Sequence, residues 1–428
     1  MSSRHRTLAE ALGFQQSSHG PTIDLTLERV REVAAHLGLL EKRCPAVIVG
    51  GTNGKGSTAS DLASMLTACG ERVGLFTSPH LIRYNERVQI DGTEVGDAML
   101  LAAFERIEAA RGATTLTFFE YNTLAALDAF RQAGVSAMVL EVGLGGRLDA
   151  TNIIDADVAV LCSVGLDHRD WLGDTLELIG AEKAGIFRAG QAVVLGNLDM
   201  PASVWERAAA LQCRVHAAQR DFEARVHGRG DRSERWDFRS ALCKLDDLPA
   251  PALAGAIQYQ NAAAALMALN LLNVPGACER DRVARGLQCV RLPGRFQRIP
   301  GEVEWVLDVA HNPPAAAVLA AELRSQPVRG RTIAVAGMLA DKDAAAVARE
   351  LDGIIDHWLL ADLSDEPRGL TAAALQARLP PLRGVLELMP DVAAACARAR
   401  ALARPRDRVV VLGSFHVVGP ALAWLGLY

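Results

Sequence analysis

The chain has 428 residues and half of them are hydrophobic, so it can bury large cores and is not a wholly disordered protein. Its length predicts two or three domains. Lys and Arg number 45 against 50 Asp and Glu, which gives a net charge of −5. This balance argues against a general binder of nucleic acid or of anionic membranes, and we expect neither partner. It still allows a local pocket for phosphates.

The targeting and cysteine signals favour a cytoplasmic protein. The longest apolar runs, such as Val158–Cys162 and Val409–Leu412, are far shorter than the ~20 residues that span a bilayer. No apolar stretch follows the first six residues, so we expect no secretory signal. The eight cysteines are scattered without a C-x-x-C pair, and we expect them to be reduced, mostly buried and not zinc-binding. We expect a cytoplasmic monomer.

Apolar, β-rich runs alternate with helical patterns along the first part of the chain, which predicts βαβ units on a parallel sheet. The predicted strands are Ala46–Gly50, Arg72–Phe76, Ala137–Glu141, Asp157–Ser163 and Ala192–Leu195. The predicted helices are Ser57–Cys69, Asp97–Ala110, Tyr121–Gln132 and Thr175–Gly185. The polar stretch Gln219–Asp247 predicts hairpins or an exposed loop, and a long Ala-rich helix follows at Gln260–Leu272.

A domain boundary is predicted around Arg291-Leu-Pro-Gly-Arg295, because a new α/β series begins after it. Its predicted strands are Trp305–Asp308, Thr332–Ala336, His357–Leu360 and Arg408–Leu412, and its predicted helices are Ala315–Ser325, Asp343–Leu351 and Asp391–Ala403. The fold class is therefore α/β, with a parallel-sheet domain at residues 1–292 and a smaller Rossmann-like domain at residues 293–428.

The segment Val49-Gly-Gly-Thr-Asn-Gly-Lys-Gly-Ser57 lies between a predicted strand and a predicted helix, where backbone N–H groups cradle phosphates. Lys55 would supply a cation for the phosphates and Ser57 a hydroxyl for Mg²⁺. The segment departs from G-x-x-x-x-G-K-[ST], since Val49 replaces the first glycine and Gly56 follows Lys55. The alternative is a Gly-rich turn with an exposed lysine.

Other candidate residues also have ordinary structural interpretations. Glu141 ends a buried strand, where a carboxylate can bind Mg²⁺ or accept hydrogen bonds from a loop or helix N-terminus. His168 follows a strand and could equally be a capping or core histidine. Taken alone, Lys183 reads as a helix-surface lysine and Asn261 as ordinary helix polarity.

The segment Gly51-Thr-Asn-Gly-Lys-Gly-Ser57 resembles the P-loop of the folate branch of the Mur ligase superfamily, which contains folylpolyglutamate synthases and dihydrofolate synthases. Further segments resemble blocks of that family in the same order and cover nearly the whole chain. These segments are Thr77–Leu81, Tyr84–Arg87, Glu141–Asn152, Leu166–His168, Leu172–Gly173, Glu182–Ile186, Leu292–Arg295, Asp308–Pro313 and Gly413–His416.

The resemblance implies ATP, two Mg²⁺ ions and a carbamylated lysine at Lys183, which would turn a cation into an anionic oxygen ligand. The implied metal ligands are Ser57, Ser78, Glu141, His168 and Lys183. The implied nucleotide contacts are Thr52, Asn53, Gly54, Lys55, Gly56, Ser57, Asn261, Arg295 and Asp308. The implied catalytic residues are Lys55, His168, Lys183 and Arg295, and the implied substrate contacts are Asp24, Leu25, Thr26, Leu27, Thr117, Leu148, His311 and Ser414.

The segment Ile23–Arg29 resembles the loop that binds dihydropteroate in the bacterial bifunctional enzymes of this branch. A compatible alternative is the first turn of an amphipathic helix, with Asp24 as its N-cap.

The resemblance implies an ATP-dependent ligase that joins L-glutamate to dihydropteroate, giving dihydrofolate, and to tetrahydrofolate or folylpolyglutamates. The carboxylate would first become an acyl phosphate, which the amine then attacks. One alternative is folylpolyglutamate synthase activity only. A second alternative is a peptidoglycan Mur-type amino-acid ligase, which Gly56 and the lack of a predicted UDP-sugar domain disfavour. The remaining alternatives are an unrelated P-loop kinase or GTPase and a non-catalytic nucleotide-binding module.

Overall fold

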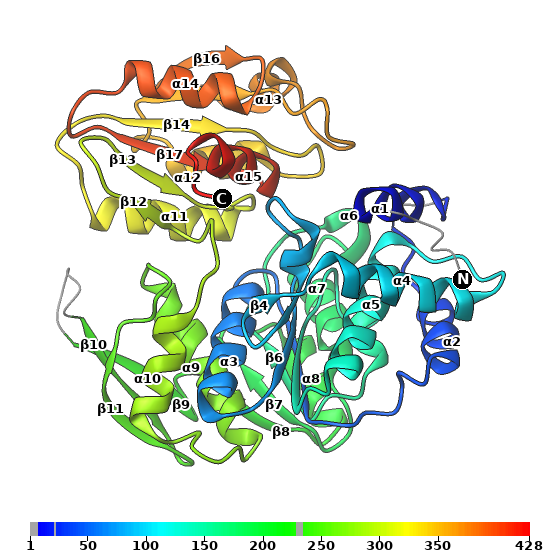
Figure 1. Ribbon diagram of the computed structural model, residues 1–428. Coiled ribbons are helices and arrows are strands. Elements are labelled where there is room, and N and C mark those ends of the chain that lie inside the picture. Colours follow the sequence, from blue (N-terminus) through cyan, green and yellow to red (C-terminus); the bar gives the residue numbers. More distant parts are fainter. Residues whose placement is uncertain (1–6, 21–22, 228–233) are drawn as a thin grey trace. The chain divides into compact units, whose positions relative to one another are not determined.

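The computed structural model describes residues 7–20, 23–227 and 234–428, which form two compact units (Figure 1). The first unit comprises the described residues within Met1–Val164, Asp174–Ala252 and Tyr259–Val290, and the second comprises Gly165–Gly173, Leu253–Gln258 and Arg291–Tyr428. The sequence did not anticipate that two short segments from before the predicted boundary, Gly165–Gly173 and Leu253–Gln258, group with the C-terminal unit. None of the helices in the described ranges is long and apolar enough to cross a membrane.

The first unit is built on a sheet in the order β4-β3-β2-β5-β1-β6-β7-β8. Its strands are β1 (Ala46–Gly50), β2 (Val73–Phe76), β3 (Val88–Ile90), β4 (Thr93–Glu94), β5 (Ala137–Glu141), β6 (Val158–Leu161), β7 (Ala192–Leu195) and β8 (Arg214–Ala217). The strands from β2 to β8 in this order run parallel, whereas β3 and β4 form an antiparallel edge. The predicted parallel sheet is therefore confirmed.

Helices cover both faces of this sheet, because alternate strand residues enter opposite hydrophobic clusters. Ile48 of β1 packs in one cluster, and Val47 and Val49 pack in the other. The helices of the first unit are α1 (Leu8–Ser17), α2 (Glu28–His36), α3 (Lys55–Cys69), α4 (Asp97–Arg111), α5 (Phe118–Ala133), α7 (Leu176–Lys183), α8 (Ala202–Ala210), α9 (Ile257–Leu271) and α10 (Arg280–Cys289). Short 3₁₀ helices lie at Tyr84–Arg87, Ala150–Ile153 and Ala184–Ile186.

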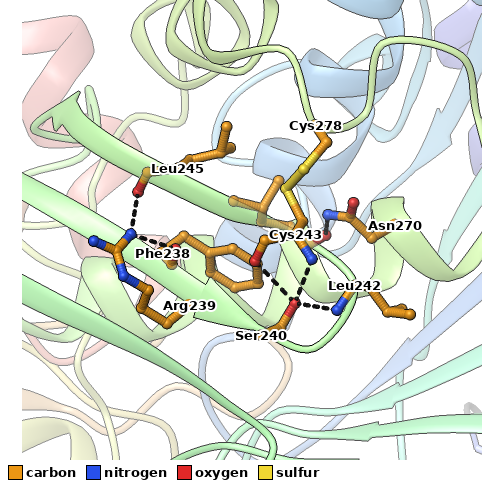
Figure 2. Close-up of a disulfide and its surroundings, with 9 residues drawn as sticks. Phe238, Arg239, Ser240, Leu242, Cys243, Leu245, Asn270 and Cys278 are labelled. Atoms are coloured by element: carbon orange, nitrogen blue, oxygen red, sulfur yellow. Dashed lines mark hydrogen bonds between the residues drawn. A yellow bond between two sulfur atoms is a disulfide. The ribbon is translucent and has the colours of Figure 1, made fainter.

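The polar stretch after β8 forms an antiparallel sheet of β9 (Phe222–His227), β10 (Arg235–Ser240) and β11 (Lys244–Pro249). The predicted hairpins are present. In the turn between β10 and β11, Ser240 Oγ accepts hydrogen bonds from the backbone N–H groups of Leu242 and Cys243 (Figure 2).

Figure 2 also shows a disulfide between Cys243 and Cys278, whose Cα atoms are 5.8 Å apart. The expectation that all cysteines are reduced is therefore wrong for this pair. The two residues are 35 positions apart and meet because the β10–β11 turn lies against the loop before α10, which no local pattern reveals. The remaining cysteines, all in described segments, are free thiols.

The second unit carries a sheet in the order β12-β13-β17-β14-β15-β16, parallel except at β12. Its strands are β12 (Gln297–Ile299), β13 (Glu304–Leu307), β14 (Thr332–Ala336), β15 (His357–Ala361), β16 (Val385–Met389) and β17 (Arg408–Leu412). Its helices are α6 (Arg169–Leu172), α11 (Pro313–Ser325), α12 (Ala344–Leu351), α13 (Ala372–Arg378), α14 (Val392–Leu402) and α15 (Phe415–Trp424). This is the smaller α/β unit that the sequence predicts.

Candidate active site

The loop between β1 and α3 depends on glycine. Gly51 and Gly54 have φ angles of 148° and 87°, which disfavour residues with a side chain. A Cβ atom at Gly54 would also lie 2.8 Å from Asn261 Oδ1. Asn261 on α9 is 7% exposed and therefore lies against the loop, so its interpretation as ordinary helix polarity is wrong.

Two lysines converge on this loop. Lys55 Nζ donates to the carbonyl oxygens of Gly51 at 3.0 Å and Thr52 at 3.2 Å. Lys183 Nζ donates to the same Gly51 oxygen at 3.1 Å, and Lys183 is 5% exposed. The surface-lysine interpretation of Lys183 is therefore wrong. Two lysine side chains thus meet at one carbonyl of the loop, and Lys55 can supply positive charge to an anionic phosphate bound there.

The Gly-rich turn after β5 lets the end of α7, which carries Lys183, pack closely against it. A Cβ atom at Gly146 would lie 2.8 Å from the carbonyl oxygens of both Glu182 and Lys183 at the end of α7. The turn is held by buried Asp149, whose Oδ2 accepts from the N–H groups of Gly143 and Leu144, both at 2.9 Å. Burial raises the pKa of Asp149, against the hydrogen bonds that it accepts. Sequence reasoning did not single out this residue.

Glu141, Ser78 and Ser57 gather at the carboxyl ends of neighbouring strands. Glu141 ends β5 and is 4% exposed, and its Oε2 accepts a hydrogen bond from the Ser78 N–H at 3.0 Å. Ser78 follows β2, which pairs with β5, and buried Ser57 lies in the first turn of α3 after β1. Glu141 therefore accepts a hydrogen bond from a loop N–H, which was one of its two interpretations. It also lies at the carboxyl edge of the parallel sheet, where ligands bind in this type of fold.

This arrangement suits an Mg²⁺ ion that takes most of its ligands from substrate phosphates and water. The described ranges contain no group of three or more His, Cys, Asp or Glu side chains gathered for a metal ion. Mg²⁺ keeps several waters and is usually bound by one or two carboxylates together with substrate phosphates. The Glu141 carboxylate and the Ser57 and Ser78 hydroxyls are the hard oxygen donors that this ion prefers.

A second group of the first unit joins the predicted substrate contacts Asp24 and Thr117. Asp24 Oδ2 accepts from Arg29 Nη1 at 2.7 Å and lies 3.2 Å from His19 Nε2. Arg29 Nη2 donates to Glu120 Oε1 at 3.2 Å, and Glu120 Oε2 accepts from the Thr117 N–H at 2.7 Å. The two predicted contacts are thus linked through Arg29 and Glu120.

The helix-cap interpretation of Asp24 is wrong, because α2 begins at Glu28 and its N-cap is Leu27. Nearby, the buried Thr26 hydroxyl has no hydrogen-bond partner among the described residues. Leu25, Leu27 and Leu148 are half-buried. Sequence reasoning missed Arg29 and Glu120. The capping box formed by Thr117 and Glu120 at the start of α5 was a signal that could have identified Glu120.

In the second unit, Asp308 and Arg295 lie near the ends of β13 and β12. Half-buried Asp308 accepts from the N–H groups of Phe296 and Ala310, both at 2.8 Å. Burial raises the pKa of Asp308, against the hydrogen bond from Phe296 and the charge of Arg295. The Arg295 guanidinium stacks over the Phe415 ring at 5.1 Å.

The same aromatic ring brings in the remaining predicted residues. The His311 ring is 6.4 Å from that of Phe415, and buried Ser414 is the N-cap of α15 after β17. Since β13 and β17 are parallel neighbours, these side chains occupy one edge of the sheet. The Phe415 ring, which the sequence reasoning did not name as part of the site, is thus near both Arg295 and His311.

His168 belongs to the second unit by its contacts. It occupies the N-cap position of α6 with a φ of 52°, and its side chain is 31% exposed. His168 therefore lies at a helix N-terminus, and its exposure shows that it is not a core histidine. The predicted site is divided accordingly, with Lys55, Glu141 and Lys183 in the first unit and His168, with Arg295 and Asp308, in the second.

Comparison with known proteins identifies the family. Residues 49–269 match the Mur ligase middle domain, and residues 294–415 match the Mur ligase glutamate ligase domain. The dihydrofolate synthase/folylpolyglutamate synthase of Escherichia coli strain K12 is 44% identical over 417 residues, which cover 96% of this chain and 94% of that protein. The chain belongs to the Mur ligase family. Within it, the chain falls in the dihydrofolate synthase/folylpolyglutamate synthase branch, so the alternative of an unrelated P-loop kinase or GTPase is wrong.

Solved structures agree with this assignment. E. coli FolC in complex with DHPP and ADP superposes with a TM-score of 0.92 at 41% identity, covering 100% of this chain and 99% of that one. A bifunctional folylpolyglutamate synthase/dihydrofolate synthase with Mn, AMPPNP and L-glutamate bound gives a TM-score of 0.89 at 42% identity, with 98% of each chain covered. The predicted α/β Mur-ligase-like fold of this Mur ligase is confirmed.

Proposed function

We propose that this Mur ligase joins L-glutamate to dihydropteroate, giving dihydrofolate, and to tetrahydrofolate and its polyglutamates, with ATP converted to ADP and phosphate. The observation that carries the proposal is the convergence of Lys55 and Lys183 on the Gly51 carbonyl, in the Gly-rich loop at the start of α3. The E. coli and bifunctional relatives bind ADP or AMPPNP, DHPP and L-glutamate, which supports this choice of substrates.

The first chemical step joins two anions, since the folate carboxylate attacks the γ-phosphate of ATP. Lys55 supplies positive charge at the phosphates, and backbone N–H groups at the start of α3 bind their oxygens. Arg295 supplies a further cation from the second unit, and Asp308 accepts hydrogen bonds from the ribose. The glutamate amine then attacks the acyl phosphate and phosphate leaves. His311 and Ser414 orient the glutamate, and no protein nucleophile is needed.

Two metal ions complete this proposal. Ser57, Ser78 and Glu141 would hold one Mg²⁺, and His168 with carbamylated Lys183 would hold the second. Bound Mg²⁺ neutralises phosphate charge and so lowers the repulsion between the two reacting anions. Carbamylation adds CO₂ to the neutral Lys183 amine and releases a proton. The burial of Lys183 beside the P-loop supports this modification, because a buried amine disfavours the charged form.

The site residues are divided between the units, so we propose that the units come together during each turnover. Asp24, Arg29, Glu120 and Thr117 form the linked network that would bind the pterin of dihydropteroate. This network supports bifunctionality over polyglutamylation alone.

Release of ADP from Mg-ATP and L-glutamate tests the function with three acceptors in parallel. We expect ADP release and a glutamylated product with dihydropteroate and with tetrahydrofolate, and none with a UDP-muramyl acceptor. Activity with tetrahydrofolate alone would refute bifunctionality. Activity with only the UDP-muramyl acceptor, or with none of the three, would refute the folate ligase.

A further inference from the structure

Asp167 is the centre of a buried polar cluster in the second unit. Lys342 Nζ donates to Asp167 Oδ1 at 2.6 Å, and Asn312 Nδ2 donates to Oδ2 at 2.9 Å. His311 Nε2 lies 3.5 Å from the same Oδ2. The Asp167 and Lys342 side chains are 7% and 6% exposed, so both charged groups are largely shielded from solvent.

The cluster ties together segments that are far apart in the sequence. Asp167 lies in the segment Gly165–Gly173, which belongs to the second unit. The stretches of chain directly before and after this segment belong to the first unit. Asn312 follows β13 and Lys342 follows β14, and both strands flank β17. The carboxylate of Asp167 therefore fastens its segment to the carboxyl edge of the C-terminal sheet.

The cluster also fixes the backbone of His168. Asp167 Oδ1 accepts the His168 N–H at 2.9 Å as well as the Lys342 ammonium. His168 has a left-handed φ of 52°, which is uncommon for a residue with a side chain, and the Asp167 carboxylate binds its N–H in this conformation. Asn312 is itself held, because its Oδ1 accepts from the Ala315 N–H at the start of α11.

The charges of the cluster match one another. The Lys342 ammonium donates to the Asp167 carboxylate at 2.6 Å and both side chains are buried, so each charged group has the other as its partner. Removing one partner of such a pair leaves an uncompensated buried charge, which disrupts the contact strongly.

We propose that Asp167 and Lys342 are positioning residues, whose buried ion pair makes the His168 segment part of the C-terminal unit and delivers His168 to the metal with that unit. This inference rests on the proposed function, in which His168 is a metal ligand. Neither Asp167 nor Lys342 needs to touch the reacting atoms for this role.

The test compares Lys342→Met, which removes the charge and keeps the length, with Lys342→Arg, which keeps the charge. Asp167→Asn serves as a second, nearly isosteric variant in case Lys342→Met does not fold. The matched control is Arg398→Met, which breaks an exposed ion pair with Glu387 in the same unit. Hydrogen exchange of residues 165–173 is measured on the full chain, together with the Mn²⁺ dependence of ligation.

We expect Lys342→Met and Asp167→Asn to speed exchange in residues 165–173 and to raise the Mn²⁺ concentration for half-maximal ligation about 10-fold or more, the range seen when a residue behind a metal ligand is lost. The KM for tetrahydrofolate should stay unchanged. Lys342→Arg should keep the exchange of residues 165–173 and the Mn²⁺ dependence close to those of the wild type. Arg398→Met should alter neither property.

Unchanged exchange and an unchanged Mn²⁺ dependence in Lys342→Met would overturn the inference. A rise in the KM for glutamate alone would do the same, since Lys342 would then act on the substrate directly. If the wild-type chain shows no ligase activity, the proposed function fails, while the exchange measurement still decides whether the ion pair fastens the segment.

Discussion

Replacing Asp61 by Asn should make the stability of this protein less sensitive to rising pH. Asp61 lies on α3, the helix that follows the phosphate-binding loop, and its exposed fraction is 0%. Neither carboxylate oxygen has a hydrogen-bond partner in the described part of the chain. Burial therefore raises the pKa of Asp61 well above its usual value.

The sign of the effect follows from proton binding. The folded chain keeps the Asp61 proton over a pH range in which the unfolded chain has already released it, so stability falls as the pH rises. The contribution is fully present below the unfolded pKa of about 4 and is lost up to the raised pKa of the folded state. Each pH unit in this window costs about 1.4 kcal/mol. Between about pH 5.5 and about pH 7.5 the loss from this one group is therefore at most about 2.7 kcal/mol.

Urea unfolding of the wild type, Asp61→Asn and Asp61→Leu at both pH values measures this loss. The free energy of unfolding of both variants relative to the wild type should rise with pH, because neither new side chain ionises. Asp365→Asn, which changes an exposed carboxylate, is the control and should show no such trend. A difference between Asp61→Asn and the wild type that stays constant across the two pH values would refute the reasoning.

Three further predictions concern other parts of the first unit. Replacing Cys243 and Cys278 by Ser should lower the free energy of unfolding by roughly 4 kcal/mol without reductant, because the disulfide restricts the entropy of a loop of this length in the unfolded chain. Denaturation with and without a dithiol measures the change, with Cys289→Ser as the control. A wild type whose stability does not respond to the dithiol would contradict the prediction. Lys183→Ala should abolish ligation, with partial rescue by acetate; wild-type turnover of the variant in CO₂-free buffer would remove the carbamate role. Arg29→Met should raise the KM for dihydropteroate about 10-fold or more, since a hydrogen bond to a charged group contributes roughly 1.5–3 kcal/mol, and should affect tetrahydrofolate less. Equal effects on both acceptors would count against a dihydropteroate loop.

The buried parallel strands were predictable because both of their faces are covered, so that each is a continuous apolar run. Strands β1, β5, β7, β14 and β17 begin and end at the predicted residues. Helix α3 begins two residues before the prediction, at Lys55, since the left-handed Gly54 forms its N-cap. Helix α10 was missed because its sequence, Arg280–Cys289, is mostly polar and its few apolar residues face α3.

Local sequence blocks identified the chemistry of the site but not the contacts that hold it. The P-loop, Glu141 and Lys183 stand in motifs, whereas the partners of Asp167 are 145 and 175 residues away in the sequence. The same holds for the contact between Arg29 and Glu120, which are 91 residues apart. Contacts of this kind depend on the tertiary fold, and a single sequence carries no signal for them.

The interleaved path of the chain has a consequence for biosynthesis. The segment Gly165–Gly173 is made long before the sheet to which it belongs, and Asp167 leaves the ribosome 175 residues ahead of Lys342. Domains generally fold in the order in which they are synthesised, so the first unit can form its sheet while this loop still lacks its countercharge. The loop reaches its final conformation only when the last third of the polypeptide has emerged. Cutting the gene after residue 290 would therefore yield two fragments that are both incomplete, one with an unsatisfied Asp167 and the other with an unsatisfied Lys342.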